Sequence, residues 1–229
     1  AMGAGATLHE DTAALRVIEG KRPKVETASG TISAETVILA CNGYLDGLHA
    51  ETEARVMPIH NFILATEPLG ERAKTLIPGR EAACDSRFVV NYWRLSADSR
   101  LIFGGGETYG RSFPEDIKGF VRKHMLKLYP QLADVRIDYG WGGTLAVTMK
   151  RLPYLRRLSP GFYTSGGYSG QGVGTATFAG RILAEAICGE QERFDVFASL
   201  PNIPFPGGKL FRYPTLVLAM TWYALRDRL

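Results

Sequence analysis

The chain has 229 residues, of which 45% are hydrophobic and 22% charged, with 27 Lys and Arg against 23 Asp and Glu. This balance is typical of a folded globular protein, and the scattered basic residues do not form the stripe expected of a nucleic-acid-binding surface. The three cysteines and four histidines show no metal-ligand spacing, so we expect no metal site, no disulfide framework and a cytoplasmic location.

The first elements predicted along the chain are short strands. Residues 14–33 alternate between apolar and polar positions and are broken by turn dipeptides, which indicates a small antiparallel meander. Thr36–Ala40 is instead a continuous apolar run, typical of a strand buried on both faces. It ends at Asn42 and Gly43, a position where open α/β sheets place their ligands.

The middle of the chain predicts a second sheet with a helix over it. Strands are expected at Phe62–Thr66, Phe88–Leu95, Arg100–Gly104 and Val135–Trp141, separated by polar turns. Apolar residues at helical spacing follow Pro114 and predict a helix to about Tyr129, where Pro130 stops it.

The most informative stretch is the glycine-rich segment 167–174. Phe162–Ser165 reads as a strand leading into it, and Thr175–Ile187 reads as a helix leaving it. Glycines at such a junction let backbone N–H groups and a helix N-terminus approach an anionic or electron-rich ligand. A dinucleotide fingerprint would require a strand–helix–strand unit and a later acidic residue, which this segment does not offer. A tight turn that only permits close packing is the alternative.

The end of the chain is apolar from Pro214 to Leu225. This stretch is too short for a transmembrane helix, which takes about 20 residues. We expect a terminal helix packed on the protein, with a membrane-surface anchor as the alternative.

Several stretches, taken in order, resemble the D-amino-acid oxidase superfamily of FAD-dependent amine and amino-acid oxidoreductases, and within it γ-glutamylputrescine-oxidase-type enzymes. The resemblance rests on residues 35–44, 63–69, 92–95, 101–105, 141–148, 151–153, 167–173 and 204–208. The Gly-x-Gly-x-x-Gly segment with which such proteins begin has no counterpart here, so the chain is expected to correspond to their C-terminal half.

The patterns and the resemblance together predict an α/β (α+β) fold. It comprises a partial FAD-binding domain and an antiparallel-sheet substrate domain with a covering helix. The expected divisions are 1–55 for a remnant of the FAD-binding domain, 56–140 for the substrate sheet, 141–200 for the return to the FAD-binding domain, and 201–229 for a tail helix.

The resemblance also implies which residues meet the ligands, although it identifies no catalytic residue. FAD would be held non-covalently, because the segment 141–148 lacks the Cys that one related group uses as a tether. Gln171 stands where many relatives have His, so assistance at the flavin ring would come from backbone dipoles. The expected cofactor-binding residues are Asn42, Gly43, Gly167, Tyr168, Ser169, Gly170, Gln171, Gly172 and Val173.

The implied substrate-binding residues are His60, Tyr92, Trp93 and Trp141. The alternative is core packing for the aromatic side chains and a structural, hydrogen-bonded role for His60. The expected function is oxidation of a C–N bond in an amine or amino acid by the complete enzyme. The alternative is a non-catalytic remnant that binds a small molecule or a partner chain. The isolated chain is expected to purify without stoichiometric FAD, and the expected partner is a second chain with the pyrophosphate site or a homodimer.

Overall fold

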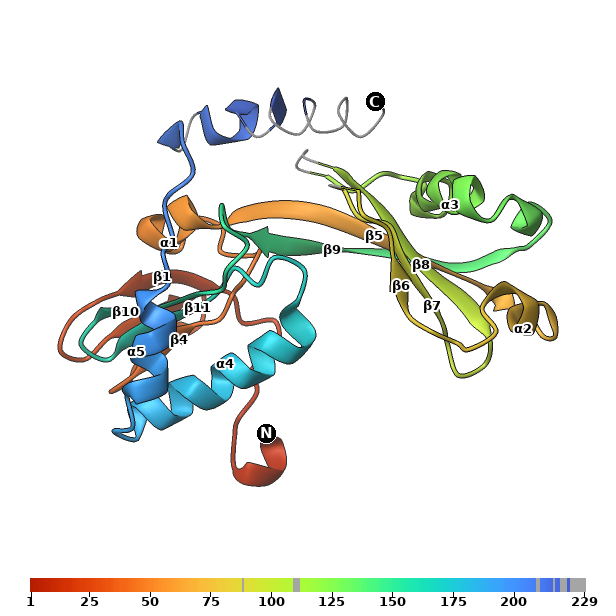
Figure 1. Cartoon of the computed structure of the whole chain (residues 1–229). Coiled ribbons are helices and arrows are strands. Elements are labelled where there is room, and N and C mark those ends of the chain that lie inside the picture. The colour runs from red at the N-terminus through yellow and green to blue at the C-terminus, as the bar shows by residue number, and fades with distance from the viewer. Residues whose placement is uncertain (88, 109–111, 209–210, 216, 219–221, 223–229) are drawn as a thin grey trace. The chain divides into compact units, whose positions relative to one another are not determined.

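The computed structural model describes residues 1–87, 89–108, 112–208, 211–215, 217–218 and 222. It divides into two compact units, one of residues 1–57 and 146–205 and the other of residues 58–145 and 206–229. Figure 1 shows the elements of both units along the chain. Of the predicted tail helix at 201–229, residues 211–215 and 217–218 are helical, and residues 209–210, 216, 219–221 and 223–229 lie outside the described residues.

The first unit contains two three-stranded sheets. The antiparallel meander β1-β2-β3 is confirmed, because its alternating residues and turns specify local pairing. The second sheet has the order β10-β11-β4, with β11 antiparallel to β10 and parallel to β4. The strands are β1 (Ala14–Ile18), β2 (Lys24–Thr27), β3 (Gly30–Ser33), β4 (Val37–Leu39), β10 (Tyr154–Ser159) and β11 (Phe162–Gly166).

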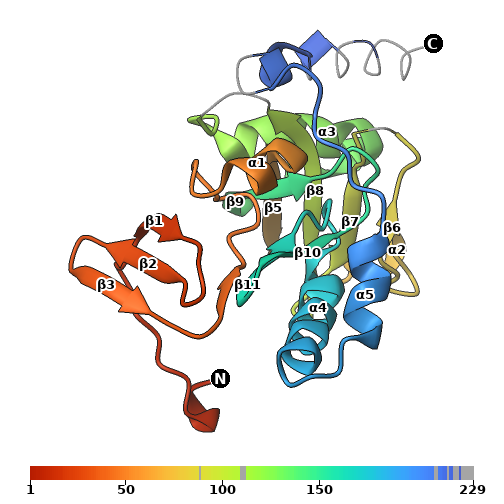
Figure 2. The same cartoon turned by 90° about the vertical axis from the view of Figure 1, so that its left-hand side faces the viewer.

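Helices α4 and α5 pack against β11 and β10 of the β10-β11-β4 sheet (Figure 2). Apolar residues of α4 and α5 pack with Leu155 and Tyr163 of that sheet. Val17 of the meander packs instead against a second cluster that contains Leu39 and Phe162. The helices are a 3-10 turn η1 (Met2–Ala4), α1 (Ala50–Arg55), α4 (Gly172–Ile187) and α5 (Glu192–Ser199).

The expectation that residues 36–40 form a strand buried on both faces is wrong. Ile38 in the middle of β4 is 39% exposed. Val37 and Leu39 pack on one face of β4 in a cluster that contains Phe162, whereas the described residues leave the other face, with Ile38, open. An apolar run in the sequence does not by itself say how many layers will cover the strand.

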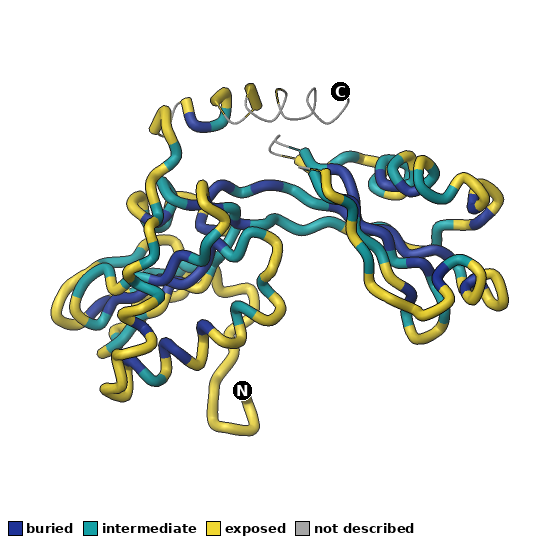
Figure 3. Tube along the Cα trace, viewed as in Figure 1, coloured by how far each residue is buried: buried dark blue, intermediate teal, exposed yellow. Residues whose placement is uncertain are grey.

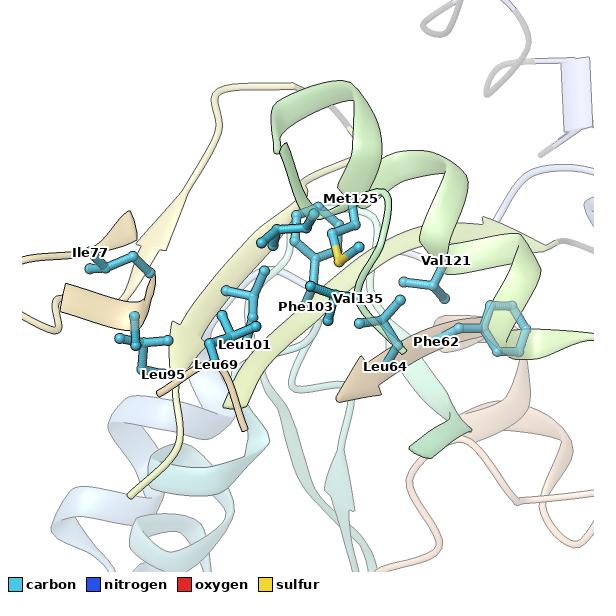
Figure 4. Packing of buried hydrophobic residues seen from close by; sticks show 12 residues of the cluster. Phe62, Leu64, Leu69, Ile77, Leu95, Leu101, Phe103, Val121, Met125 and Val135 are labelled. Atoms are coloured by element: carbon cyan, nitrogen blue, oxygen red, sulfur yellow. The ribbon is translucent and has the colours of Figure 1, made fainter. Parts of the chain in front are cut away.

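The second unit is a five-stranded sheet of order β6-β7-β8-β5-β9 with α3 packed on one face. Its core lies between that face and the helix (Figure 4), where Phe62, Leu101 and Phe103 of the sheet meet Val121 and Met125 of α3. Its elements are β5 (Met57–Pro68), α2 (Arg72–Leu76), β6 (Ala83–Cys84), β7 (Tyr92–Leu95), β8 (Arg100–Thr108), α3 (Ile117–Leu128), a 3-10 turn η2 (Pro130–Leu132) and β9 (Ile137–Val147).

Several helices and strands begin at other residues than the sequence predicted. Helix α3 begins at Ile117 and not after Pro114, because the Asp116 side chain caps it by accepting a hydrogen bond from Gly119 N at 2.8 Å. Strand β7 begins at Tyr92, later than the expected 88, which itself lies outside the described residues. Helix α4 begins at Gly172, three residues before the expected Thr175. The covering helix and the antiparallel sheet are confirmed.

Candidate functional site

The glycine-rich segment of the first unit forms a sharp turn between a buried strand and a long helix. All five residues of β11 are buried. After the strand, Gly167, Ser169 and Gly170 have φ of 68°, 52° and 91°. These left-handed conformations reverse the chain within a few residues, and α4 starts at Gly172. The segment is therefore a strand–turn–helix junction with a defined backbone.

Asn42 fixes this turn from the neighbouring strand. It follows β4, which runs parallel to β11 with Leu39 opposite Thr164. Its Oδ1 accepts a hydrogen bond from Gly167 N at 3.1 Å. Asn42 and Gly43 themselves lie in a second tight turn after β4, which is closed by Tyr44 N donating to Cys41 O at 2.9 Å. The structure thus brings together two predicted cofactor-binding segments that lie 125 residues apart in the sequence.

A layer of side chains behind the turn leaves no room at Gly167. A Cβ there would lie 2.5 Å from Thr148 Cγ2 and 3.4 Å from Tyr154 Cβ. Ser169 ties the turn to the same layer, because Thr148 N donates to its Oγ at 3.2 Å and its own N donates to Ala146 O at 2.9 Å. Tyr168 is held through its hydroxyl, 2.7 Å from Ser165 Oγ. Thr148 is a supporting residue that no sequence pattern singled out.

The first turn of α4 faces outward. Gln171 at the N-cap makes no side-chain capping hydrogen bond, and the first turn contains no acidic residue. Val173 is 96% exposed, and a Cβ on Gly174 would contact nothing within 4 Å. On α4 the buried residues begin only at Ala179 (Figure 3). The N–H groups of the first turn and the positive end of the helix dipole are therefore available to an external acceptor.

In the second unit, Tyr92 lies across the sheet on the face opposite α3. A Cβ on Gly104 would lie only 2.1 Å from Tyr92 Cζ, so the ring passes directly over the β8 backbone. Its hydroxyl donates to Asn61 Oδ1 on β5 at 2.5 Å. Burial, and then the negative charge of Glu107, raise the pKa of Tyr92 to about 12, so the phenol stays neutral at physiological pH.

The other predicted substrate residues divide between the two faces of the sheet. Trp93 stacks on Phe103 with ring centroids 5.9 Å apart and belongs to the core under α3. His60 lies on the same side, where its Nδ1 is 3.0 Å from Thr144 Oγ1 and its ring meets Phe113. Trp141 is 45% exposed.

The open face of the sheet is the face opposite α3. On β9, Gly140 and Gly142 lie against Lys118 and Phe62 on the α3 side. Trp141 alternates with these glycines and so shares the open face with Tyr92. Of the four predicted substrate residues, two therefore face the open side and two face the core.

The sequence patterns did not single out Asn61, Glu107 or the bulge beside them. Between the pairs Asn61–Glu107 and Ile63–Gly104, β8 carries one residue more than β5. Gly106 within this bulge has φ of 78°. Three consecutive glycines in a strand are a signal for a bulge or a close approach, and that signal was available at residues 104–106.

In the described part of the chain, no group of three or more His, Cys, Asp or Glu is placed to hold a metal ion. In the same residues, no helix has the length and apolar character needed to cross a bilayer.

The fold thus combines a glycine turn at the end of a strand that pairs in parallel with a separate antiparallel-sheet unit. The sequence profile of the family described as FAD dependent oxidoreductase (DAO) matches residues 1–186. The chain belongs to this family.

Individual relatives support the assignment. The chain is 46% identical over 226 residues to a probable oxidoreductase OrdL of Rhizobium meliloti, which covers 98% of this chain and 53% of that protein. It is 41% identical over 227 residues to the gamma-glutamylputrescine oxidoreductase of Escherichia coli, again 98% of this chain and 53% of that protein. The chain therefore spans about half the length of the curated relatives it matches.

Solved structures share the fold. Glycine oxidase from Bacillus cereus superposes with a TM-score of 0.70 at 19% identity, over 87% of this chain and 55% of that one. L-proline dehydrogenase from P. horikoshii gives 0.66 at 23% identity, over 81% and 52%.

Proposed function

We propose that this chain takes part in the FAD-dependent oxidation of a C–N bond in an amine or amino acid, supplying the turn that meets the flavin ring and the sheet that meets the substrate. The observation that carries the proposal is the outward-facing start of α4, which follows a turn held in place by the hydrogen bond from Gly167 N to Asn42 Oδ1. Membership of the FAD-dependent oxidoreductase family and the likeness to a gamma-glutamylputrescine oxidoreductase support it.

The residues at the turn fit a flavin ring. The first N–H groups of α4 have no side-chain cap, so they offer hydrogen-bond donors to the carbonyl side of the ring. The turn is glycine-rich and its outer positions are open, so the backbone can approach a flat group closely. We propose Asn42, Gly43, Gly167, Tyr168, Ser169, Gly170, Gln171, Gly172 and Val173 as the contacts.

FAD, when bound, supplies the redox chemistry by accepting a hydride from the carbon next to the substrate nitrogen. The chain's own residues contribute orientation and electrostatics. The N-terminal end of α4 stabilises negative charge that develops on the ring, and the Asn42 hydrogen bond keeps Gly167 in place. Tyr92 and Trp141 are the proposed substrate contacts, since both lie on the open face of the sheet. Core packing of Trp93 and the contact between His60 and Thr144 support a structural role for these two residues instead.

The remainder of the FAD site is proposed to come from sequence outside these 229 residues, either in the same polypeptide or in a second chain. Within the described residues β4 ends its sheet, so its outer edge can accept a further parallel strand. The 39% exposed Ile38 lies on this strand and would be covered by that addition. The isolated chain is accordingly expected to bind FAD weakly or not at all.

Two variants at one exposed position test the role of the α4 terminus. Val173→Asp places a carboxylate in the first turn, where it should stabilise the helix but repel negative charge on the flavin ring. Val173→Asn is the neutral control of the same shape. Because Val173 is 96% exposed, neither change should disturb packing.

The assay is anaerobic mixing with a panel of amines and amino acids, followed by the loss of flavin absorbance. The sample is this chain combined with FAD and with the part of the Rhizobium meliloti relative that the chain does not cover. We expect bleaching with at least one substrate, and bleaching at least several-fold slower for Val173→Asp than for Val173→Asn. A bound flavin that no compound bleaches would refute the enzymatic proposal and favour the non-catalytic binding module. Equal rates for the two variants would refute the role given to the helix terminus.

A further inference from the structure

Thr148 lies directly behind the glycine turn of the first unit and is only 1% exposed. Its Cγ2 methyl occupies the space next to Gly167, since a Cβ on that glycine would lie 2.5 Å from the methyl carbon. Its backbone N–H donates to Ser169 Oγ at 3.2 Å, and that hydroxyl donates to Gly167 O at 3.3 Å. Thr148 therefore contacts two residues of the turn that hold left-handed conformations, Gly167 with φ of 68° and Ser169 with φ of 52°.

Thr148 is itself held from the side away from the glycine turn. Its Oγ1 donates to Leu152 O at 2.7 Å, and its carbonyl oxygen accepts from Arg151 N at 3.0 Å. Arg151 has φ of 55°, so residues 148–152 form a tight turn closed on Thr148. A β-branched side chain has few χ1 rotamers, and fixing its hydroxyl also fixes its methyl. The hydrogen bond to Leu152 O thus keeps the Cγ2 methyl directed at Gly167.

The backbone N–H groups of the glycine turn alternate between engaged and available. Gly167 N donates to Asn42 Oδ1 at 3.1 Å, and Ser169 N donates to Ala146 O at 2.9 Å. The N–H groups of Tyr168 and Gly170 have no acceptor among the described residues. The residues behind the turn therefore hold Gly167 and Ser169, and leave the intervening donors, beside the first turn of α4, for an external acceptor.

We propose that Thr148 is a positioning residue for the flavin ring, and that it acts through its Cγ2 methyl on Gly167. This inference rests on the proposed function and deepens it by assigning the residue that sets how closely the donors of the turn approach the ring. Preorganised N–H donors stabilise negative charge that appears on reduction, so their position tunes the reduction potential of the cofactor. Without the methyl, Gly167 can settle back into the space behind it and draw these donors away from the ring.

The competing explanation is that Thr148 only fills space in the interior. A residue of that kind would affect the stability of the chain and would weaken the binding of oxidised and reduced flavin to the same extent. A positioning residue affects the reduced ring more, because the donors interact with negative charge that the oxidised ring lacks. The two explanations therefore differ in the reduction potential of the bound flavin.

Two variants separate the methyl from the hydroxyl. Thr148→Ser removes Cγ2 and keeps the hydrogen bond to Leu152 O, whereas Thr148→Val keeps a methyl at Gly167 and removes the hydrogen bond. The sample is this chain combined with FAD and with the part of the Rhizobium meliloti relative that the chain does not cover, and the reduction potential is measured at pH 7 against a reference dye.

We expect Thr148→Ser to weaken the binding of reduced flavin about three- to tenfold more than that of oxidised flavin. For a two-electron couple this ratio corresponds to a fall in potential of about 14–30 mV. Thr148→Val should restore the potential of the wild type.

A second measurement needs no flavin and follows hydrogen exchange of the Gly167 and Ser169 amides in the 229-residue chain. Thr148→Ser should speed their exchange about three- to tenfold, because the void behind Gly167 favours local opening. Thr148→Val should leave the exchange close to that of the wild type. Thr66→Ser is the matched control, since Thr66 is also fully buried but lies on β5 in the second unit. It should leave both amides unchanged.

A wild-type potential in Thr148→Ser, with flavin bound, would overturn the proposal and leave the proposed function intact. Equal falls in Thr148→Ser and Thr148→Val would also overturn it, because the methyl would then not be the cause. Exchange of the Gly167 and Ser169 amides that Thr148→Ser does not change would overturn the support given to the turn. A wild-type sample that binds no flavin would refute the proposed function and, with it, the role of Thr148 at the flavin.

Discussion

Gly104→Ala should destabilise the second unit through a single side chain, the Tyr92 ring. The new Cβ would lie 2.1 Å from Tyr92 Cζ and 2.5 Å from its hydroxyl oxygen. Ordinary contact begins near 3.4 Å, so the ring has to move by about 1.3 Å (3.4 − 2.1). That movement breaks the 2.5 Å hydrogen bond to Asn61.

The magnitude follows from three contributions. Overpacking costs about 1–3 kcal/mol. The lost hydrogen bond costs about 1 kcal/mol. Ala also reduces the conformational entropy of the unfolded chain, which stabilises the folded protein by about 0.5–1 kcal/mol. This gain applies at Gly104 because its φ is not positive, so Ala can adopt the same backbone conformation. The free energy of unfolding should fall by about 2 kcal/mol.

The assay is urea denaturation followed by tryptophan fluorescence. All three tryptophans, at positions 93, 141 and 222, belong to the second unit, so the signal reports this unit. Gly143→Ala is the control, since a Cβ at that position of β9 would contact nothing within 4 Å. It should be neutral or stabilising by up to about 1 kcal/mol.

A double-mutant cycle isolates the contact with Tyr92. In a Tyr92→Ala background both the clash and the hydrogen bond are gone, so adding Gly104→Ala should no longer destabilise. The coupling free energy should be about 2–3 kcal/mol. Wild-type stability for Gly104→Ala, or an undiminished loss in the Tyr92→Ala background, would refute the reasoning.

Three further changes test the two sites. Gly167→Ala should lower stability by about 1–3 kcal/mol, because it combines a left-handed φ with a 2.5 Å approach to Thr148, and thermal melting of the chain measures this. In the sample that combines the chain with the uncovered part of the Rhizobium meliloti relative it should also abolish flavin binding, which flavin titration measures; unaltered values would contradict the prediction. Asn42→Ala should cost about 1–2 kcal/mol by removing the bond to Gly167 N, which amide hydrogen exchange at Gly167 would report as faster opening. Tyr92→Phe tests the raised pKa. The phenol ionises at lower pH in the unfolded chain than in the folded protein, so the free energy of unfolding of the wild type falls as pH rises from 10 to about 12. In Tyr92→Phe this fall should be smaller by about 2–3 kcal/mol, as measured by urea denaturation at a series of pH values. Parallel pH profiles would rule this out.

The sequence alone determined the elements that depend on interactions between neighbouring residues, namely the meander and the glycine turn. The meander formed as expected because period-2 alternation and turn dipeptides fix pairing between neighbouring segments. The glycine turn between β11 and α4 was located for the same reason, although the helix begins three residues earlier than Thr175. Glycine is a poor helix former in the interior of a helix, but in an exposed first turn its cost is small, and the helix extends through Gly172 and Gly174.

Only the tertiary structure decided which distant residues meet. The Asn42–Gly167 hydrogen bond depends on the parallel register of β4 and β11, which no local pattern encodes. The Tyr92–Asn61 contact depends on the order of β7, β8 and β5 and on a bulge in β8, so an alternation of residues could not show that Trp93 faces the core and Tyr92 the open side. Burial of residues 36–40 failed as an expectation for the same reason. An apolar sequence sets how strongly a strand avoids water, whereas the layers that cover it are set by segments far away in the chain.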